Sequence, residues 1–212
     1  MKNMLYKEFR LTLHPLFYLA FLFGVLLLIP QWPYFIALMY FFFIVVPNIF
    51  TTAKAQGDLD FSASLPVRRG DIVKARLLSI VILELLQIVV ASIFASINVA
   101  LYPMGNFLMD TNAAFIGFVF IMYGIHNVIL FPMFYKTAYK IAAPTFAAII
   151  VSVLFSVAVE TAVQIIPAAR VLDGSLSTWT HYVVLIVGMV IFVLLNVVAA
   201  KISVKRFEGV NL

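Results

Sequence analysis

The chain has 212 residues, of which 65% are hydrophobic and only 11% are charged, whereas a soluble globular domain is about half apolar and about a quarter charged. So little charge cannot cover a surface that faces water, so a soluble globular protein is excluded and lipid must be the solvent for most of the chain. The formal charge of +5 does not indicate a nucleic-acid partner, because the basic residues lie at the ends of hydrophobic stretches. The chain contains no cysteine, which excludes disulfides and thiolate metal sites.

Residues 1–14 are polar apart from one apolar stripe. Leu5, Phe9 and Leu13 are spaced by four and would share one face of a helix, while basic residues such as Lys7 would fall on another. This pattern predicts an amphipathic helix that lies along the cytoplasmic surface of the membrane. A basic anchor that only sets the topology is the alternative interpretation.

Six hydrophobic stretches follow, which suits a single domain, residues 1–212, with roughly 20 apolar residues per membrane span. They predict an all-α, polytopic membrane protein. The first stretch is interpreted as an uncleaved span, because a second span follows directly after Gln31-Trp32-Pro33. Pro47 lies inside the second span and should kink it. The predicted spans are residues 16–30, 34–53, 77–102, 112–134, 141–166 and 181–200.

The distribution of Lys and Arg predicts the orientation of these spans. Thirteen of the fourteen basic residues fall on one side of the membrane, and only Arg170 falls on the other. Cytoplasmic loops are enriched in Lys and Arg, so both termini are predicted to lie in the cytoplasm, with the chain in the cell membrane. The thirteen residues are Lys2, Lys7, Arg10, Lys54, Arg68, Arg69, Lys74, Arg76, Lys136, Lys140, Lys201, Lys205 and Arg206.

The segment between the second and third spans, residues 54–76, is far more polar than the rest of the chain. Asp58 and Asp60 suit the positive end of a helix, and the Asp58 side chain is a plausible cap for it. Pro66 limits this helix to about two turns. A second cap is expected at Gly70-Asp71, before the third span.

Phe61 and Leu65 are spaced by four on this short helix and would project together into the cytoplasm. A short helix with such an apolar knob is suited to bind in a groove on another protein. In the alternative interpretation, the knob packs against the ends of the protein's own spans.

The same segment resembles the membrane subunits of type 2 ABC exporters. The similar features are an acidic helix start, Ser-Leu-Pro-Val-Arg-Arg, Asp-Ile-Val and Lys-Ala-Arg before a span. The resemblance implies that residues 58–65 form the coupling helix that docks on an ATPase subunit, and that residues 1–14 form the interfacial connecting helix. The small six-span form most resembles exporters of amphipathic peptides, bacteriocin-like or modulin-like. The coupling residues implied are Asp58, Asp60, Phe61, Leu65, Arg68 and Arg69.

No phosphate loop of the form Gly-x-x-x-x-Gly-Lys-Ser/Thr occurs in the chain, so it is not expected to hydrolyse ATP or to act as an enzyme. No cofactor or metal is expected in this chain. The resemblance implies partner ATPases that hold ATP and Mg, a second permease copy or paralogue, and membrane lipid. The alternative function is a membrane-embedded substrate-capture subunit of an energy-coupling importer, which is also small but does not need the pattern of residues 58–76.

Polar side chains inside the spans form two ridges. In the third span, Glu84, Ala91 and Asn98 recur every seven residues, and in the fifth, small and polar residues are spaced by four from Ala148 to Gln164. Ionisable groups at membrane depth are costly and often functional, which favours a role in transport for the two glutamates. Ordinary helix packing is the alternative interpretation for the small residues. The candidate translocation-path residues are Glu84, Gln87, Asn98, Asn127, Glu160 and Gln164.

Overall fold

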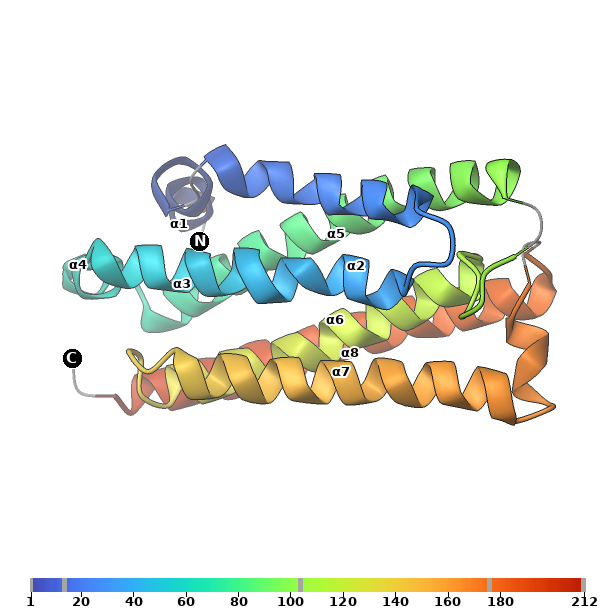
Figure 1. Cartoon of the computed structure of the whole chain (residues 1–212). Coiled ribbons are helices and arrows are strands. Elements are labelled where there is room, and N and C mark those ends of the chain that lie inside the picture. The colour runs from blue at the N-terminus through green and yellow to red at the C-terminus, as the bar shows by residue number, and fades with distance from the viewer. Residues whose placement is uncertain (1, 13–14, 103–104, 175–176, 211–212) are drawn as a thin grey trace.

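The computed structural model describes residues 2–12, 15–102, 105–174 and 177–210, and the regular structure within these ranges is helical, without β-strands. Among the described residues, five helices are long and apolar enough to cross a membrane. They run lengthwise through one bundle (Figure 1). These five are Tyr34–Ala55, Arg69–Leu101 (α5), Ala113–Tyr135 (α6), Ala142–Ile165 (α7) and Trp179–Glu208 (α8).

The two ends of the bundle differ in what they carry (Figure 1). The short helices α1 (Lys2–Lys7) and α4 (Asp58–Ser64) lie at one end, together with the last turns of α8. We call this end the α4 end. The opposite end carries other connections between spans, including residues 105–111 and the 3₁₀ turn η4 (Ala169–Leu172).

The first predicted span forms a 3₁₀-helix, η2 (Pro15–Leu28), of 14 residues. It is shorter than the five candidate spans, so the predicted count of six is not established by helix length alone. It lies along α5 (Figure 1). Gly24 permits a close approach, since a Cβ atom there would lie 3.1 Å from the backbone nitrogen of Ala91.

The second predicted span is one continuous helix with a π-helical turn inside it. It consists of α2 (Tyr34–Tyr40), the π-helical turn η3 (Phe41–Val45) and α3 (Val46–Ala55). This wider turn ends at Val45, two residues before Pro47, close to the place where the sequence predicts a disturbance of the helix. Asn48 Nδ2 donates to the Ile44 carbonyl oxygen at 2.6 Å, which provides a side-chain partner for the backbone there.

Both α5 and α8 extend beyond the predicted spans at the α4 end. α5 begins at Arg69, with Arg68 at its N-cap position, so the predicted cap at Gly70-Asp71 is wrong. Its 33 residues span about 50 Å at 1.5 Å per residue. The two extensions support each other, because Arg69 Nη1 donates to the carbonyl oxygens of Phe207 and Val210 at 3.2 and 2.6 Å.

α6 and α7 begin and end within a residue or two of the predicted boundaries. Asn112 caps α6, its side-chain oxygen accepting from the backbone N–H of Phe115 at 3.0 Å. Pro103, the residue directly after the third predicted span, lies outside the described residues, as do Met1, Leu13 and His14 of the predicted interfacial helix. α6 packs backbone to backbone against α8, where Gly117 and Gly188 meet.

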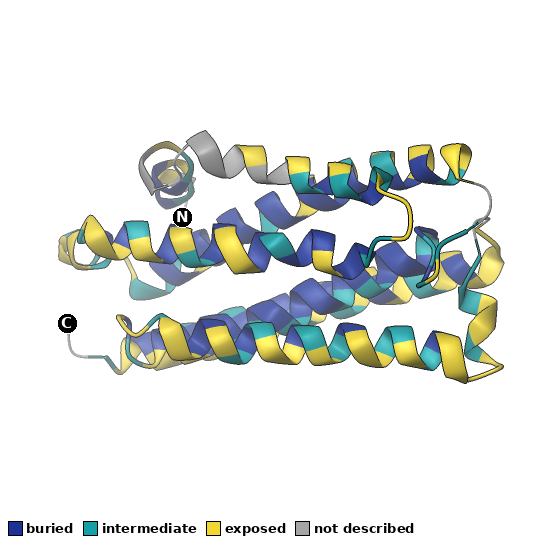
Figure 2. Ribbon diagram, viewed as in Figure 1, coloured by how far each residue is buried: buried dark blue, intermediate teal, exposed yellow. Residues whose placement is uncertain are grey.

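Burial separates an inner from an outer set of helix faces (Figure 2). α6 is the most buried candidate span, whereas α7 and α8 are the least buried. Their outer faces carry large apolar side chains such as Phe146, Leu154 and Val190. An apolar outer surface of this extent is typical of a protein surrounded by lipid.

We expect Gly188→Ala to destabilise the folded protein, because its methyl group would lie 2.2 Å from the carbonyl oxygen of Gly117. Overpacking of this kind costs about 1–3 kcal/mol. The melting temperature of the purified protein in detergent measures the loss. Gly209→Ala is the matched control, since its Cβ atom would meet nothing closer than 3.7 Å. Equal losses in both variants would contradict the explanation by close helix contact.

Candidate functional site

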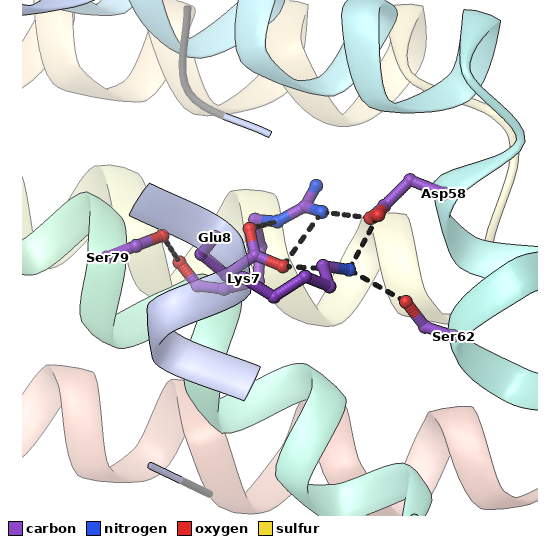
Figure 3. Close-up of polar contacts among 6 residues, drawn as sticks. Lys7, Glu8, Asp58, Ser62 and Ser79 are labelled. Atoms are coloured by element: carbon purple, nitrogen blue, oxygen red, sulfur yellow. Dashed lines mark hydrogen bonds and ion pairs between the residues drawn. The ribbon is translucent and has the colours of Figure 1, made fainter. Parts of the chain in front are cut away.

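Four charged side chains from three separate segments meet at the α4 end (Figure 3). Lys7 is the last residue of α1, Glu8 begins the π-helical turn η1 (Glu8–Thr12), Asp58 begins α4, and Arg76 lies in α5. All four are buried, Glu8 completely. We call this group the ionic junction.

Lys7 and Arg76 each bridge both acids of the ionic junction. Lys7 Nζ lies 2.6 Å from Asp58 Oδ1 and 3.4 Å from Glu8 Oε1, and it donates to Ser62 Oγ at 2.7 Å. Arg76 Nη2 donates to Asp58 Oδ2 at 2.5 Å and to Glu8 Oε1 at 3.2 Å, while its Nε donates to Glu8 Oε2. The N-terminal segment, α4 and α5 are therefore joined by shared ions rather than by separate pairs.

The ionic junction is electrically balanced, with two cations and two anions. Removing an ion from water costs several kcal/mol, and burial is tolerated only where partners and geometry compensate. Each carboxylate oxygen of Glu8 and Asp58 has a cationic partner here. The Arg76 guanidinium also lies 5.8 Å from the centre of the Phe50 ring, a favourable cation–π distance.

The turn before α4 aims Asp58 inward. Gly57 has φ +62°, a left-handed conformation that glycine adopts without a steric penalty. The predicted helix at residues 58–65 is present as Asp58–Ser64, but Gly57 holds the N-cap position and no side chain caps the helix. Asp58 therefore anchors the helix from its first turn, and its carboxylate is engaged with Lys7 and Arg76 instead of capping backbone N–H groups.

The outer face of α4 is exposed. The Phe61 side chain is 58% exposed and Asp60 is also exposed, while Ser62 is fully buried beside Lys7. Leu65 is half-buried and lies just after the helix in extended conformation. Phe61 is thus the main apolar group on this face.

The two arginines of the predicted coupling set have different environments. Arg68 is exposed, whereas Arg69 donates to the last carbonyl groups of α8. Of the six predicted coupling residues, those exposed at the α4 end are Asp60, Phe61 and Arg68.

Sequence reasoning missed the partners that hold α4 in place. Lys7 entered the prediction as a basic residue of the interfacial helix and Arg76 as part of the Lys-Ala-Arg motif, neither as a partner of Asp58, and Glu8 and Ser62 were assigned no role. The one available signal was Glu8, an acid within a basic N-terminal segment. Its partner Arg76 is 68 residues away, and no spacing rule in a sequence connects the two.

Two of the predicted path residues form a buried polar chain inside the bundle. Asn127 Nδ2 of α6 donates to Glu84 Oε2 of α5 at 2.8 Å and to Asn196 Oδ1 of α8 at 3.0 Å. Glu84 and Asn127 are fully buried. The second carboxylate oxygen of Glu84 has no partner among the described residues. This chain joins three helices in the interior, and it reaches an open surface at its Asn196 end, which lines a groove between α5 and α8.

Two further predicted path residues connect α5 to α2 and η2 by hydrogen bonds. Gln87 Nε2 donates to the Leu38 carbonyl oxygen at 3.4 Å. Asn98 Nδ2 donates to the Leu27 carbonyl oxygen at 2.7 Å and to the Tyr34 hydroxyl at 3.0 Å. Both side chains are buried within the bundle.

The last two predicted path residues lie at the opposite end. Glu160 Oε2 accepts from the Met109 backbone N–H at 2.9 Å, and Gln164 Nε2 donates to the Phe107 carbonyl oxygen at 3.3 Å. These bonds tie α7 to the connection before α6. The six predicted path residues thus fall into three groups, and a role for any of them in transport stays a prediction.

The Asp110 carboxyl, in the connection before α6 at the opposite end, has a raised pKa. Burial raises the pKa of the Asp110 carboxyl and the negative charge of Asp173 adds to this, while the hydrogen bond from the Asn106 backbone N–H opposes it. The protonated form of Asp110 is therefore favoured by folding, and its stabilising effect is lost as pH rises through the folded-state pKa.

A large cavity lies between α3 and α7, towards the α4 end. Its volume is about 1130 Å³ and most of its wall is apolar. Lys54 and Lys140 are its charged lining residues. Thr145 also lines it, and the Thr145 hydroxyl is buried without a partner among the described residues. Sequence analysis did not identify this cavity, because its walls are 90 or more residues apart in several places and none of its residues forms a motif.

We expect Arg76→Gln to destabilise the protein by about 3–5 kcal/mol, because Glu8 and Asp58 would remain buried with too little positive charge. Combining it with Glu8→Gln removes one charge of each sign, so the double variant should lose less than the sum of the two single variants. Melting temperatures in detergent measure the three losses. Arg68→Gln, an exposed arginine on the same segment, should have little effect. Additive losses in the double variant would argue against a shared junction.

Comparison with known proteins identifies a family but no individual relative. Residues 3–208 match the family model described as ABC-2 family transporter protein. No curated protein and no solved structure matches the chain. Because the family match covers nearly the whole chain, the protein belongs to the ABC-2 family and is a multi-pass membrane permease subunit of an ABC transporter, a class that associates with ABC ATPase subunits.

Proposed function

We propose that the chain is the permease subunit of an ATP-driven exporter that moves a hydrophobic or amphipathic substrate, such as a peptide, lipid or drug, out of the cell. ATP and Mg²⁺ would bind to the separate ATPase subunits. The α4 end would face the cytoplasm, because most basic residues are assigned to that side. Among these substrates, amphipathic peptides remain the preferred class.

The observation that carries this proposal is the placement of α4. Its inner face is fixed by Asp58 of the ionic junction and by Ser62, which accepts a hydrogen bond from Lys7, and its outer face presents Phe61. A helix held rigidly on one face and exposed on the other suits the transfer of force from a bound partner. Movement of an ATPase groove around Phe61 would be passed to α5 through Arg76 and to the N-terminal segment through Lys7. The alternative, a substrate-capture subunit of an importer, gives this anchored helix no role.

We also propose that η2 is the sixth crossing. A 3₁₀-helix rises about 2.0 Å per residue, so the 14 residues of η2 cover about 28 Å. This is close to the hydrocarbon thickness of about 30 Å. The same residues in an α-helix would cover only about 21 Å. Six crossings place both termini on the α4 side.

The cavity between α3 and α7 is our candidate for the cytoplasmic entrance of the substrate path. Its apolar wall would accept the hydrophobic part of a substrate, and Lys54 and Lys140 would attract an acidic group. Thr145 offers a buried hydroxyl without a partner among the described residues. The cavity is open to one side, which a second permease copy or a paralogue would close.

We expect Phe61→Asp to release the ATPase subunit, because a charged group would replace the exposed apolar side chain on α4. Binding hot spots of this kind contribute about 2 kcal/mol or more, which corresponds to a loss of affinity of about thirtyfold. Co-purification with the ATPase, or its titration against the permease in detergent, measures this loss.

Tyr6→Asp is the matched control for this experiment. Tyr6 is an aromatic residue at the same end, with 65% of its side chain exposed, but it lies on α1. It should retain the ATPase. An ATPase that stays bound to Phe61→Asp, or leaves both variants equally, would argue against coupling through α4.

We expect Lys54→Glu combined with Lys140→Glu to reduce the export of an acidic amphiphile, because the entrance of the cavity would then repel it. A loss of about tenfold or more in the initial rate, with ATPase binding unchanged, is the expected result. Transport into inverted vesicles measures it. Lys136→Glu makes the same charge reversal at an exposed position outside the cavity and should transport normally. Unchanged transport by the double variant would remove this cavity from the path.

A further inference from the structure

A second groove runs between α5 and α8, separate from the cavity between α3 and α7. It consists of two adjoining pockets of about 290 and 410 Å³ that share Lys74, Val197 and Ala200. The pocket of about 290 Å³ is almost entirely apolar, with Asn196 as its uncharged polar lining residue. The remaining lining residues are Leu77, Leu78, Val81, Phe192, Val193, Lys201 and Val204.

The groove exists because α5 and α8 touch at the α4 end while α8 follows α6 elsewhere. Gly70 of α5 meets Val204 of α8, with 3.2 Å between the position of a Cβ atom and the valine methyl. Further along, α8 is held against α6 at the contact of Gly117 and Gly188. The space left between α5 and α8 is open along its length and lined by apolar side chains on both walls.

Two lysines mark the α4 end of this groove, one on each wall. Lys74 belongs to α5 and Lys201 to α8, and both are exposed. Neither forms an ion pair or a hydrogen bond through its side chain with another described residue. No acidic residue is among the described residues that line the groove. Two uncompensated positive charges therefore lie at the mouth of an apolar channel.

We propose that this groove binds one anionic phospholipid. The phosphate would lie between Lys74 and Lys201, and an acyl chain would follow the apolar wall along Leu77, Val81 and Val193. Basic pockets between membrane helices on the cytoplasmic side bind anionic head groups. A free phosphate would leave the apolar part of the groove unused. The proposal rests on the chemistry of the groove and does not depend on what the protein transports.

Lipid bound in this groove would stabilise the start of α5. Lys74 lies two residues before Arg76, which is a member of the ionic junction. A phosphate between the two lysines would hold α5 and α8 together at the point where both leave the membrane. The bound lipid would then stabilise the same region that positions α4.

The test uses the full chain, purified in detergent and stripped of lipid. Phosphatidylglycerol or phosphatidylcholine is added, and retained lipid is counted by native mass spectrometry while the melting temperature is recorded. We expect phosphatidylglycerol to be retained and to raise the melting temperature, and phosphatidylcholine to do neither. Lys74→Gln with Lys201→Gln should weaken phosphatidylglycerol binding by about thirtyfold.

Two further variants make the result specific to the groove. Lys136→Gln with Lys205→Gln removes the same charge from two exposed lysines that do not line it, and should bind lipid normally. Val193→Trp keeps both lysines but fills the apolar channel, and should lose the lipid. Equal retention of the two lipids, equal losses in the two lysine pairs, or unchanged binding by Val193→Trp would each overturn the proposal.

Discussion

The arrangement of the α4 end depends on a balance of four buried charges. Burying the four charged side chains of the ionic junction together costs desolvation, which is compensated mainly by their contacts with one another. The need to pair these charges fixes the N-terminal segment, α4 and α5 relative to one another, because moving any one charged side chain away would leave a buried charge of opposite sign without its partner. The short helix α4 contributes little hydrophobic burial of its own, so its position is set by these ions and by the turn at Gly57. Electrostatics here determines geometry more than hydrophobic packing does.

Much of the fold could be predicted from sequence, because membrane spans are recognised by length and hydropathy alone. The boundaries of α6 and α7 agree closely with residues 112–134 and 141–166. The extensions of α5 and α8 could not be predicted, since Arg69 stabilises them through carbonyl groups on a helix more than 130 residues away. The 3₁₀ conformation of η2 could not be predicted either, because hydropathy indicates which residues prefer lipid but not which type of helix the backbone forms.

The candidate site was predicted in part, for a similar reason. A short helix after Gly57 follows from local chemistry, and so does a projecting Phe61. The inward role of Asp58 depends on partners 18 and 51 residues away. The heptad spacing of Glu84 and Asn98 correctly indicates a shared helix face, but not what that face meets. It meets Asn127 in one place and η2 and Tyr34 in another, both inside the protein.

The contact between Gly117 and Gly188 determines which parts of the bundle can move independently. With backbone atoms pressed together and no side chain between them, α6 and α8 cannot slide or rotate past each other without losing the fit. They form one rigid unit, to which α5 is attached by the hydrogen bond from Asn127 to Glu84. Any rearrangement that opens and closes a passage is therefore left to the other helices, among them α3 and α7, which form two walls of the cavity near the α4 end.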